Sequence, residues 1–329
     1  MSWDLHHGEC LAHMRTMPDN SVDAIVTDPP YFGVKDDDWD NQWKDAGHFI
    51  EWIGELSEQW QRILKPNGSL YCFASPRMAA RVEVKIAERF EVLMNITWNK
   101  PTAGQGAKQE KEALRNWWPG SERIIFAEHY GSDNIAKGES SYVGKCDELR
   151  GFVFEPIRAY LDGERERAGI SSRQVNEATG TQMAGHWFTR VQWALPTAKH
   201  YATMRELFNG QGGDYLRTQY EDLRTQYEDL RRPFNVTPDV PYTDVWTFRT
   251  VQAYEGKHVC EKPLALMEHI ILASTRPGAI VFDPFMGSGS TGVAAVLNGR
   301  AFIGCEMDAK HFANASARIR KAETQPRLL

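Results

Sequence analysis

The chain has 329 residues, of which 42% are hydrophobic and 25% are charged, an ordinary composition for a soluble globular protein. This length accommodates one large α/β domain with an insertion, or two medium domains. The net charge of −6 does not indicate a nucleic-acid binder, although binding requires a local positive face rather than a positive total.

Membrane, secreted and zinc-binding proteins are excluded by the same inspection. No apolar run approaches the roughly 20 residues that span a bilayer, and the N-terminus lacks a signal-peptide pattern. We therefore expect an intracellular, cytoplasmic protein with no membrane partner. The five cysteines form no C-x-x-C pair, which suits a reducing compartment and argues against structural zinc, so we expect no metal.

Short apolar strands alternate with amphipathic helices at both ends of the chain. The run at 24–26 predicts a strand, and the apolar spacing from 49 to 63 predicts a helix that stops at Pro66-Asn67-Gly68. GSLYCFAS, EVLMNITWNK and ERIIFAEH predict strands, and MAARVEVKIAERF predicts a helix. After residue 260, LALMEHIILAS predicts a helix, followed by strands in AIVFDPF and AFIGCEMD around a Gly-rich turn and a helix. This alternation predicts a mainly parallel sheet covered on both faces.

The middle of the chain predicts loops and helices. GQGAKQEKE (104–112) and GSDNIAKGESS (131–141) are polar and contain glycine, which is typical of mobile loops. From about 152 to 209 the pattern is all-helical. Two short helices around Thr179-Gly180-Thr181 indicate a helix-turn-helix, with Met183 and Trp187 expected in its core.

An internal duplication, LRTQYED-LRTQYED-LRR, follows and predicts a helix over 214–232. Apolar residues recur in it at spacings of four and three, which is an a/d seam; they are Leu216, Tyr220, Leu223, Tyr227 and Leu230. Three turns of seam are too few for a free-standing coiled coil. The helix is interpreted as packing on its own domain, with a dimer or a DNA-proximal arm as the alternative.

The first chemical motif is TDPPYFG, residues 27–33, directly after an apolar strand. Two prolines in succession stiffen the backbone into an extended loop. Asp28 and Tyr31 are therefore expected at the carboxyl edge of the sheet, where open α/β sheets bind ligands.

The second motif is VFDPFMGSGSTG, residues 281–292. Asp283 closes a strand, and Gly287 and Gly289 allow a tight turn that approaches a ligand closely. The following helix directs its N-terminus to the same place. One strand later, Glu306 lies where an acid can accept two ribose hydroxyls. Alone, this pattern indicates either a nucleoside-type cofactor or a tight structural turn.

Taken together, D-P-P-Y and D-P-F-x-G-S-G resemble S-adenosylmethionine-dependent amino-methyltransferases, and among them the DNA methyltransferases of the β class. The resemblance extends to HGECLAHMRTMPDNSVDAIVTDPPY, LKPNGSLYCF, ITWNKP and KHVCEKPLALMEHII. It implies a circularly permuted Rossmann-like sheet with an inserted, mainly helical target recognition domain. The expected division is a catalytic half (1–130), the insertion (131–245) and a cofactor-binding half (246–329).

The resemblance also implies the cofactor contacts. Phe285, Gly287 and Gly289 would pack against the methionine part of S-adenosylmethionine, with Asp283 nearby. Glu306 would hold the ribose and Glu9-Cys10 would meet the adenine, although Asp is commoner than Glu at that first position. Lys262, in the segment 258–263, would close over the methionine end; its HVCEKP departs from the commoner His-Pro start. The full cofactor set is Glu9, Cys10, Asp28, Lys262, Asp283, Phe285, Gly287, Ser288, Gly289, Thr291 and Glu306.

The resemblance assigns catalysis to Asp28, Pro29, Pro30 and Tyr31. An exocyclic amine is a poor nucleophile because its lone pair is delocalised into the ring. Accepting its protons on the Asp28 carboxylate and the Pro29 carbonyl favours a pyramidal nitrogen, and transfer then depends mostly on positioning. The target base must leave the duplex, and Tyr31 would stack on it, which is worth roughly 1–3 kcal/mol.

The expected reaction is methylation of adenine N6 in sequence-specific sites of double-stranded DNA. D-P-P-Y is associated with adenine-N6 enzymes and S-P-P-Y with cytosine-N4 enzymes. Cytosine-N4 is therefore the alternative, followed by RNA, protein glutamine, and a non-catalytic helix-turn-helix protein. A bacterial or phage-type enzyme of this kind would work on the nucleoid, with or without a restriction partner, and a homodimer stays open because no residue requires one.

The expected DNA contacts are the least determined. Trp39 and Trp43 either approach the flipped base or anchor an acidic loop. In the helix-turn-helix, Thr181, Gln182, His186 and Arg190 would face outward from the second helix if that helix enters a major groove, with Gln182 reading adenine and Arg190 guanine. KQEKEALRNWW, with Lys108 and Lys111, and the loop near Lys137 are alternative readers.

Overall fold

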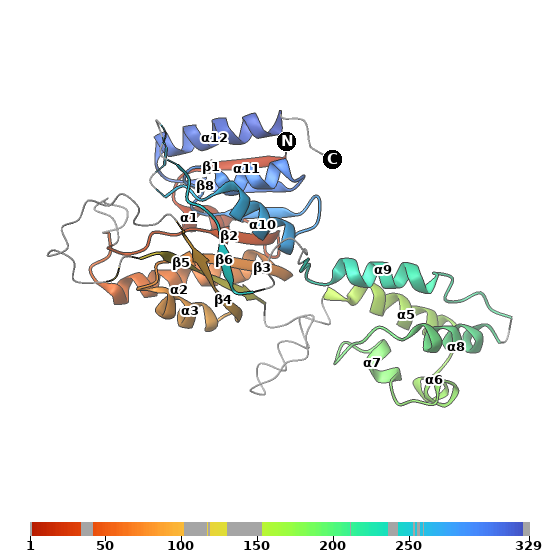
Figure 1. Ribbon diagram of the computed structural model, residues 1–329. Coiled ribbons are helices and arrows are strands. Elements are labelled where there is room, and N and C mark those ends of the chain that lie inside the picture. The colour runs from red at the N-terminus through yellow and green to blue at the C-terminus, as the bar shows by residue number, and fades with distance from the viewer. Residues whose placement is uncertain are drawn as a thin grey trace. The chain divides into compact units, whose positions relative to one another are not determined.

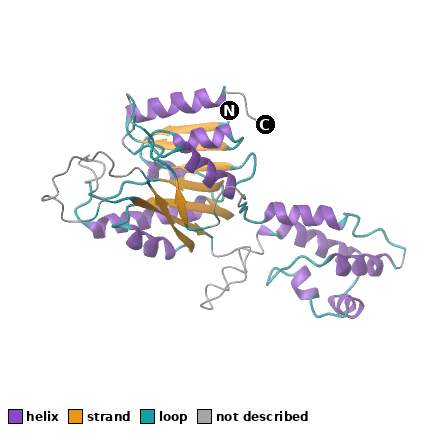
Figure 2. Ribbon diagram, viewed as in Figure 1, coloured by secondary structure: helices purple, strands orange, loops and turns teal. Residues whose placement is uncertain are grey.

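The computed structural model describes residues 2–33, 42–101, 117, 119–129, 153–210, 212–235, 243–252, 254, 257–258 and 260–324. The chain divides into two compact units, one formed by 1–129 with 233–329 and the other by 130–232 (Figure 1). The first contains the sheet, and the described part of the second consists of helices and loops (Figure 2). Each unit is described by itself.

The first unit is built on an eight-stranded sheet in the order β1-β8-β7-β2-β3-β5-β4-β6. Its strands are β1 Trp3–His7, β2 Val22–Thr27, β3 Leu64–Ala74, β4 Glu91–Asn99, β5 Ser121–Glu128, β6 Val245–Thr247, β7 Ile280–Asp283 and β8 Ala301–Glu306. All neighbouring pairs are parallel except those of β5, which is antiparallel to both β3 and β4. The mainly parallel, permuted sheet predicted from the sequence is confirmed.

Helices cover both faces of the sheet (Figure 1). On one face lie α1 Cys10–Thr16, α2 Ala46–Ile63 and α3 Ala79–Ala87; on the other lie α10 Leu264–Ser274, α11 Ser290–Leu297 and α12 Ala309–Glu323. Strand side chains alternate between the two cores: Ile25 packs with the first set of helices and Val26 with the second. Fully burying such a side chain stabilises the fold by roughly 1.5–3 kcal/mol.

The strand directions bring several polar side chains to one edge of the sheet. Seven strands end there because they run parallel to one another; they are β1, β2, β3, β4, β6, β7 and β8. The antiparallel strand β5 instead begins at this edge: Ser121 is opposite Asn99 and Arg123 is opposite Ala74. The edge therefore receives the last residues of seven strands and the first residues of β5.

The second unit packs five described helices around its own core. They are α5 Glu155–Arg167, α6 Ser172–Thr179, α7 Ala184–Phe188, α8 Ala198–Asn209 and α9 Tyr220–Leu230. Phe154, Leu161 and Trp193 are completely buried in it. Ser171 begins α6 with a capping box, and Gly180 ends that helix in the left-handed conformation.

The repeat helix is shorter than the predicted 214–232. Leu216 has a φ of 51°, outside helical space, and its backbone N–H donates to Glu164 Oε2 at 2.7 Å, so α9 begins only at Tyr220. Leu216 and Leu223 are buried, and Tyr227 packs on the same core. The apolar seam therefore packs within its own unit, as the first of the two interpretations expects.

Candidate active site

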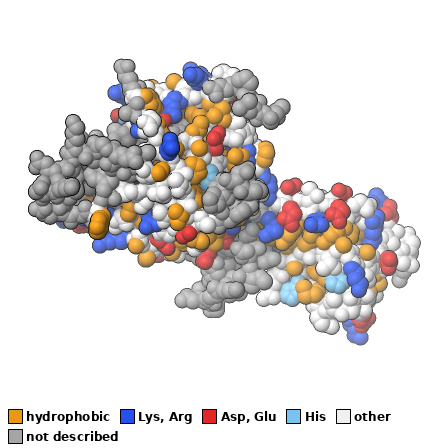
Figure 3. Space-filling view, viewed as in Figure 1, with side chains coloured by type: hydrophobic (Ala, Val, Ile, Leu, Met, Phe, Trp, Pro, Cys, Tyr) orange, Lys and Arg blue, Asp and Glu red, His pale blue; other side chains and the backbone are white. Residues whose placement is uncertain are grey.

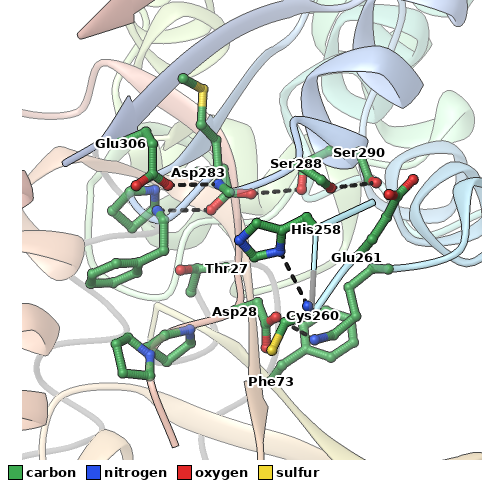
Figure 4. A pocket seen from close by; sticks show the side chains of 18 of the residues that line it. Thr27, Asp28, Phe73, His258, Cys260, Glu261, Asp283, Ser288, Ser290 and Glu306 are labelled. Atoms are coloured by element: carbon green, nitrogen blue, oxygen red, sulfur yellow. Dashed lines mark hydrogen bonds and ion pairs between the residues drawn. The ribbon is translucent and has the colours of Figure 1, made fainter. Parts of the chain in front are cut away.

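A cavity of about 1040 Å³ lies at the carboxyl edge of the sheet in the first unit (Figure 4). It brings the two chemical motifs together, although they lie more than 250 residues apart in the sequence. The predicted residues that line it are Glu9, Cys10, Asp28, Pro29, Pro30, Tyr31, Lys262, Asp283, Phe285, Gly287, Ser288, Thr291 and Glu306. Gly289 caps α11 beside them. One cavity thus contains both motifs.

Asp28 follows β2 and uses its two carboxylate oxygens differently. Oδ2 accepts a hydrogen bond from the Lys262 ammonium. Oδ1 is buried and has no hydrogen-bond partner among the described residues. Buried polar atoms are normally bonded, so an unpaired acceptor lining a cavity is suited to a ligand that donates an N–H or O–H.

A second carboxylate, Glu122 of β5, lies in the same cavity. The Tyr31 hydroxyl donates to Glu122 Oε2 at 3.0 Å. Lys262 Nζ lies 3.5 Å from the same oxygen, and the Lys100 ammonium bonds to Oε1. Lys262 is therefore shared by two largely buried carboxylates, Asp28 and Glu122, which are 18% and 14% exposed.

Burial and the charged neighbours shift the pKa values of Asp28, Glu122 and Lys262 in opposite directions. Burial raises the pKa of Asp28, and Glu122 adds to the rise, while Lys262 opposes it. Burial also raises the pKa of Glu122, but Lys262 and Lys100 outweigh it and leave the pKa below its ordinary value. Burial lowers the pKa of Lys262, yet the two carboxylates hold it above its usual range. Of the two carboxylates, Asp28 is thus the one that takes a proton more readily.

Sequence reasoning missed Glu122 and Lys100. Glu122 opens a strand, and in a parallel strand it would lie at the edge opposite the site. Only the antiparallel direction of β5 brings it to Tyr31. The sequence of this strand, SERIIFAE, has charged residues at both ends and so gives no signal of its direction.

The second motif forms a tight turn after β7. Asp283 Oδ1 accepts from the Phe285 backbone N–H at 3.0 Å, and Oδ2 accepts from the Thr291 hydroxyl at 2.6 Å. The Gly287 N–H donates to Glu306 Oε2 at 3.0 Å, which ties the turn to the end of β8. Asp283 therefore stabilises the start of α11, and Glu306 stabilises the turn.

Two glycines in this turn are required by its geometry. Gly287 has a φ of 47°, and a Cβ there would lie 3.2 Å from the His258 ring. Gly289 has a φ of 76°, and a Cβ there would lie 3.0 Å from Ala315 Cβ. The turn can therefore pass close to a ligand only with glycine at both positions.

Glu9 and Glu306 are positioned by backbone N–H groups. Glu9 caps α1, accepting from Leu11 N at 2.9 Å and from Ala12 N at 2.7 Å. Glu306 accepts from Gly287 and, at 2.8 Å, from Asp308 N. A carboxylate oxygen can accept two hydrogen bonds, so both acids retain capacity toward a ligand. Their ligand contacts stay predictions.

The segment that carries Lys262 also places His258 in the cavity, between the two motifs (Figure 4). The His258 ring packs edge-on against His311, with 4.4 Å between centroids. Burial, followed by His311, lowers the pKa of His258 to about 4. His258 is therefore neutral near pH 7 and presents an uncharged ring beside Gly287.

Replacing Asp283 by asparagine should make stability less dependent on pH. Burial raises the pKa of Asp283 to about 7, well above the ordinary value of an aspartate side chain. The folded chain therefore binds this proton more tightly than the unfolded chain, and wild-type stability falls as the pH rises from about 4 to about 7. Asparagine does not titrate and has no such loss. The free energy of unfolding of Asp283→Asn should therefore rise relative to that of the wild type by up to about 4 kcal/mol across this range, at about 1.4 kcal/mol per pKa unit. Urea unfolding at several pH values measures the gain, and a difference that stays constant with pH would contradict it.

Only some of the residues predicted to contact DNA are among those that the structure describes. Trp39, Lys108 and Lys111 lie outside the described residues. His186 lies on α7, but this helix has only five residues, so Gln182 and Arg190 lie outside it. The prediction that they share one recognition helix is wrong, because α7 begins at Ala184 and ends at Phe188.

The structure also tests the expected core positions of Trp187 and Met183, and it shows the ion pair that Arg190 makes. Trp187 is in the core, as expected, but Met183 is 37% exposed, so its core assignment is wrong. Arg190 donates to both oxygens of Glu155, each at 3.1 Å. On the visible face of this unit, basic and acidic side chains are interleaved around a hydrophobic band (Figure 3).

Comparison with known proteins identifies the family. A family model described as DNA methylase, N6_N4_Mtase, matches residues 22–317. The chain belongs to this DNA methylase family. In the described part of this family member, no helix is long and apolar enough to cross a bilayer, and no cluster of His, Cys, Asp and Glu is arranged to hold a metal ion.

Individual relatives agree with this assignment. The chain is 28% identical over 311 residues to DNA adenine methyltransferase YhdJ of Escherichia coli, covering 93% of this chain and 78% of that protein. It is 24% identical over 325 residues to the type II methyltransferase M2.MboI of Moraxella bovis, covering 93% and 84%.

Two solved structures show the same fold. The M1.HpyAVI–SAM complex superposes with a TM-score of 0.52 at 21% identity, covering 96% of this chain and 98% of that one. The cytosine-N4-specific PvuII DNA methyltransferase superposes with a TM-score of 0.54 at 11% identity, covering 99% and 88%.

Proposed function

We propose that this DNA methylase transfers a methyl group from S-adenosylmethionine to the exocyclic N6 of adenine in double-stranded DNA. The observation that carries the proposal is the unpaired Oδ1 of Asp28, a residue that lines the same cavity as the Gly287 turn and Glu306. An amino group on a flipped base would supply the missing donor. The products are N6-methyladenine and S-adenosylhomocysteine.

The residues around the glycine turn fit the cofactor. A side chain at Gly287 or Gly289 would crowd His258 or Ala315 and strain the backbone, whereas glycine leaves the backbone of the turn open to close packing of a ligand. Phe285, Ser288 and Thr291, with Asp283, would surround the methionine part, Glu306 would hold the ribose hydroxyls, and Glu9 with Cys10 would meet the adenine. When bound, S-adenosylmethionine supplies an electrophilic methyl group on a sulfonium.

The chain's own residues prepare the amino group. Asp28 Oδ1 and the Pro29 carbonyl accept hydrogen bonds from its two N–H groups, which favours a pyramidal nitrogen with an available lone pair. The two prolines hold these acceptors still, because their φ angles are restricted. Asp28, whose pKa is raised by burial, can accept a proton from the methylated nitrogen. Positioning of this kind is worth several kcal/mol.

Adenine is preferred to cytosine for two reasons. The motif begins with Asp28, and D-P-P-Y is the form associated with adenine-N6 enzymes. The Escherichia coli relative is named a DNA adenine methyltransferase, and the PvuII enzyme, which acts on cytosine N4, shares the fold at only 11% identity. Cytosine-N4 methylation stays the second candidate.

Recognition of the target sequence is assigned to the helical unit, 130–232, and to loops of the sheet unit. Tyr31 would stack on the flipped base and offset part of the cost of base flipping, which is about a few kcal/mol. The enzyme would act in the cytoplasm, at the nucleoid. Light scattering of the purified protein would decide between a monomer and a homodimer.

Analysis of methylated nucleosides tests this function. Unmethylated genomic DNA treated with the protein and S-adenosylmethionine is expected to contain N6-methyladenine and no N4-methylcytosine after digestion to nucleosides. N4-methylcytosine alone would replace adenine by cytosine as the target, and no methylated base would contradict the proposed activity. Methylation-sensitive sequencing of the same DNA then reports the recognition site.

A further inference from the structure

Glu122 occupies a place in the cavity that neither sequence motif explains. It belongs to β5, whereas Asp28 follows β2 and Lys262 precedes α10. Its side chain is only 14% exposed, although it is a carboxylate. Buried carboxylates are costly unless several partners stabilise them. Glu122 has three such partners, namely Tyr31, Lys100 and Lys262.

The contact with Tyr31 orients an aromatic ring. Its hydroxyl donates to Glu122 Oε2 at 3.0 Å, and the ring packs against the core beneath α10 and α11. Burial, Asp28 and Glu122 raise the pKa of this hydroxyl, so it stays protonated and remains a donor. Glu122 thus anchors the polar end of the ring that is assigned to stack on the target base.

The contact with Lys262 acts on Asp28. Lys262 Nζ bonds to Asp28 Oδ2 and lies 3.5 Å from Glu122 Oε2. The Lys262 side chain is only 7% exposed, and its ammonium lies over the Phe73 ring, 5.1 Å from the centroid, which restricts its movement. Held between the two acids, it occupies Oδ2 and leaves Oδ1 available.

We propose that Glu122 is a positioning residue for methyl transfer: it anchors the Tyr31 hydroxyl and shares Lys262 with Asp28, so that Asp28 presents one oxygen to the amino group of the target base. The inference rests on the proposed function of this site. Glu122 would then have two roles that can be separated. An uncharged hydrogen-bond acceptor is sufficient to anchor Tyr31, whereas only a negative charge changes the pKa of Asp28.

The groups around Asp28 determine whether removing the charge of Glu122 raises or lowers the pKa of Asp28. They are Lys262, Glu122, Tyr31, Cys72 of β3 and Asp283 at the end of β7. Glu122 raises the pKa of Asp28, while Lys262 and the Tyr31 hydroxyl lower it. Removing the charge of Glu122 therefore lowers the pKa of Asp28, both directly and by leaving Lys262 to Asp28 alone.

Three variants separate the two roles, with single-turnover methylation of unmethylated genomic DNA measured as a function of pH. Glu122→Gln retains an acceptor for Tyr31, so its KM for DNA should stay near the wild-type value while the acid limb of its rate profile moves to lower pH. Tyr31→Phe should raise the KM by about two- to tenfold, the equivalent of one hydrogen bond, without moving the acid limb downward. Glu122→Ala should show both effects.

The control is Glu128→Gln, which removes a buried carboxylate at the other end of the same strand, away from the cavity. It should retain the wild-type pH profile and KM. The proposal is overturned if Glu122→Gln lowers the rate equally at every pH, or if Tyr31→Phe and Glu122→Ala leave the KM for DNA unchanged. Adenine methylation by the wild type in the same assay reports on the proposed function, so the two claims fail separately.

Discussion

Replacing Asp28 by asparagine is expected to lower the single-turnover rate of methyl transfer by about 10²- to 10³-fold, the usual loss for one preorganised transition-state hydrogen bond. Lys262 donates to Oδ2, so the carbonyl oxygen of an asparagine would turn toward the ammonium and its NH₂ group toward the cavity. The variant would then face the amino group of the base with a second donor. Transfer of radiolabel from S-adenosylmethionine to unmethylated genomic DNA measures the loss.

The matched control for this substitution is Asp23→Asn. Asp23 lies near the start of the same strand, at the opposite edge of the sheet, where it pairs with Lys65 at 2.7 Å. This variant should retain the wild-type rate. Calorimetry should show that Asp28→Asn still binds S-adenosylhomocysteine, because the glycine turn and Glu306 are unchanged. A wild-type rate in Asp28→Asn would contradict the role assigned to its carboxylate.

Replacing Lys262 by methionine is expected to destabilise the protein by about 3–5 kcal/mol near neutral pH, the range observed when one partner of a buried ion pair is removed. The substitution leaves Asp28 and Glu122 buried together without their shared cation. The pKa of Asp28 would then rise further, since Lys262 holds it down. The folded variant would bind a proton that the unfolded chain releases, so the loss should shrink as the pH falls toward the ordinary range of a carboxyl group.

Urea unfolding of Lys262→Met at several pH values measures this loss. Adding Glu122→Gln to the variant should restore part of the stability, because one of the two unpaired charges is removed. Lys65→Met is the control: Lys65 pairs with Asp23 but is 37% exposed, so its loss should cost no more than about 1 kcal/mol. A loss that does not depend on pH, or no recovery in the double variant, would contradict the shared-cation arrangement.

Much of the sheet unit could be predicted from the sequence because its signals are local. Apolar runs of strand length alternate with helical spacing, and this determines a mainly parallel sheet with helices on both faces. The stiff prolines after Asp28 and the glycines after Asp283 each follow a strand. Since parallel strands end at one edge, the sequence alone was sufficient to place the two motifs in one cavity.

The partners of the site could not be predicted in the same way. Glu122 reaches the cavity only because β5 runs antiparallel, and no local pattern in its sequence states the direction of a strand. Lys262 was assigned to the cofactor from the resemblance, but its closest contact is the Asp28 carboxylate. Such pairings depend on which segments meet in three dimensions.

In the helical unit, the sequence predicted the presence of the helices better than the residues at which they begin and end. The duplicated sequence continues the apolar spacing back to Leu216, yet the backbone there is left-handed and α9 starts at Tyr220. Similarly, the pattern that suggested a recognition helix is realised as only one short turn from Ala184 to Phe188. Tertiary contacts such as the Glu164 bond to Leu216 override the spacing in these places.

A crystal structure of the wild-type chain with S-adenosylhomocysteine and a DNA duplex containing its recognition site tests the central claim most directly. We expect the N6 amino group of a flipped adenine within hydrogen-bonding distance of Asp28 Oδ1, Lys262 still on Oδ2, and the cofactor product against Gly287 and Glu306. An amino group bonded elsewhere, with Oδ1 facing away from it, would contradict the account.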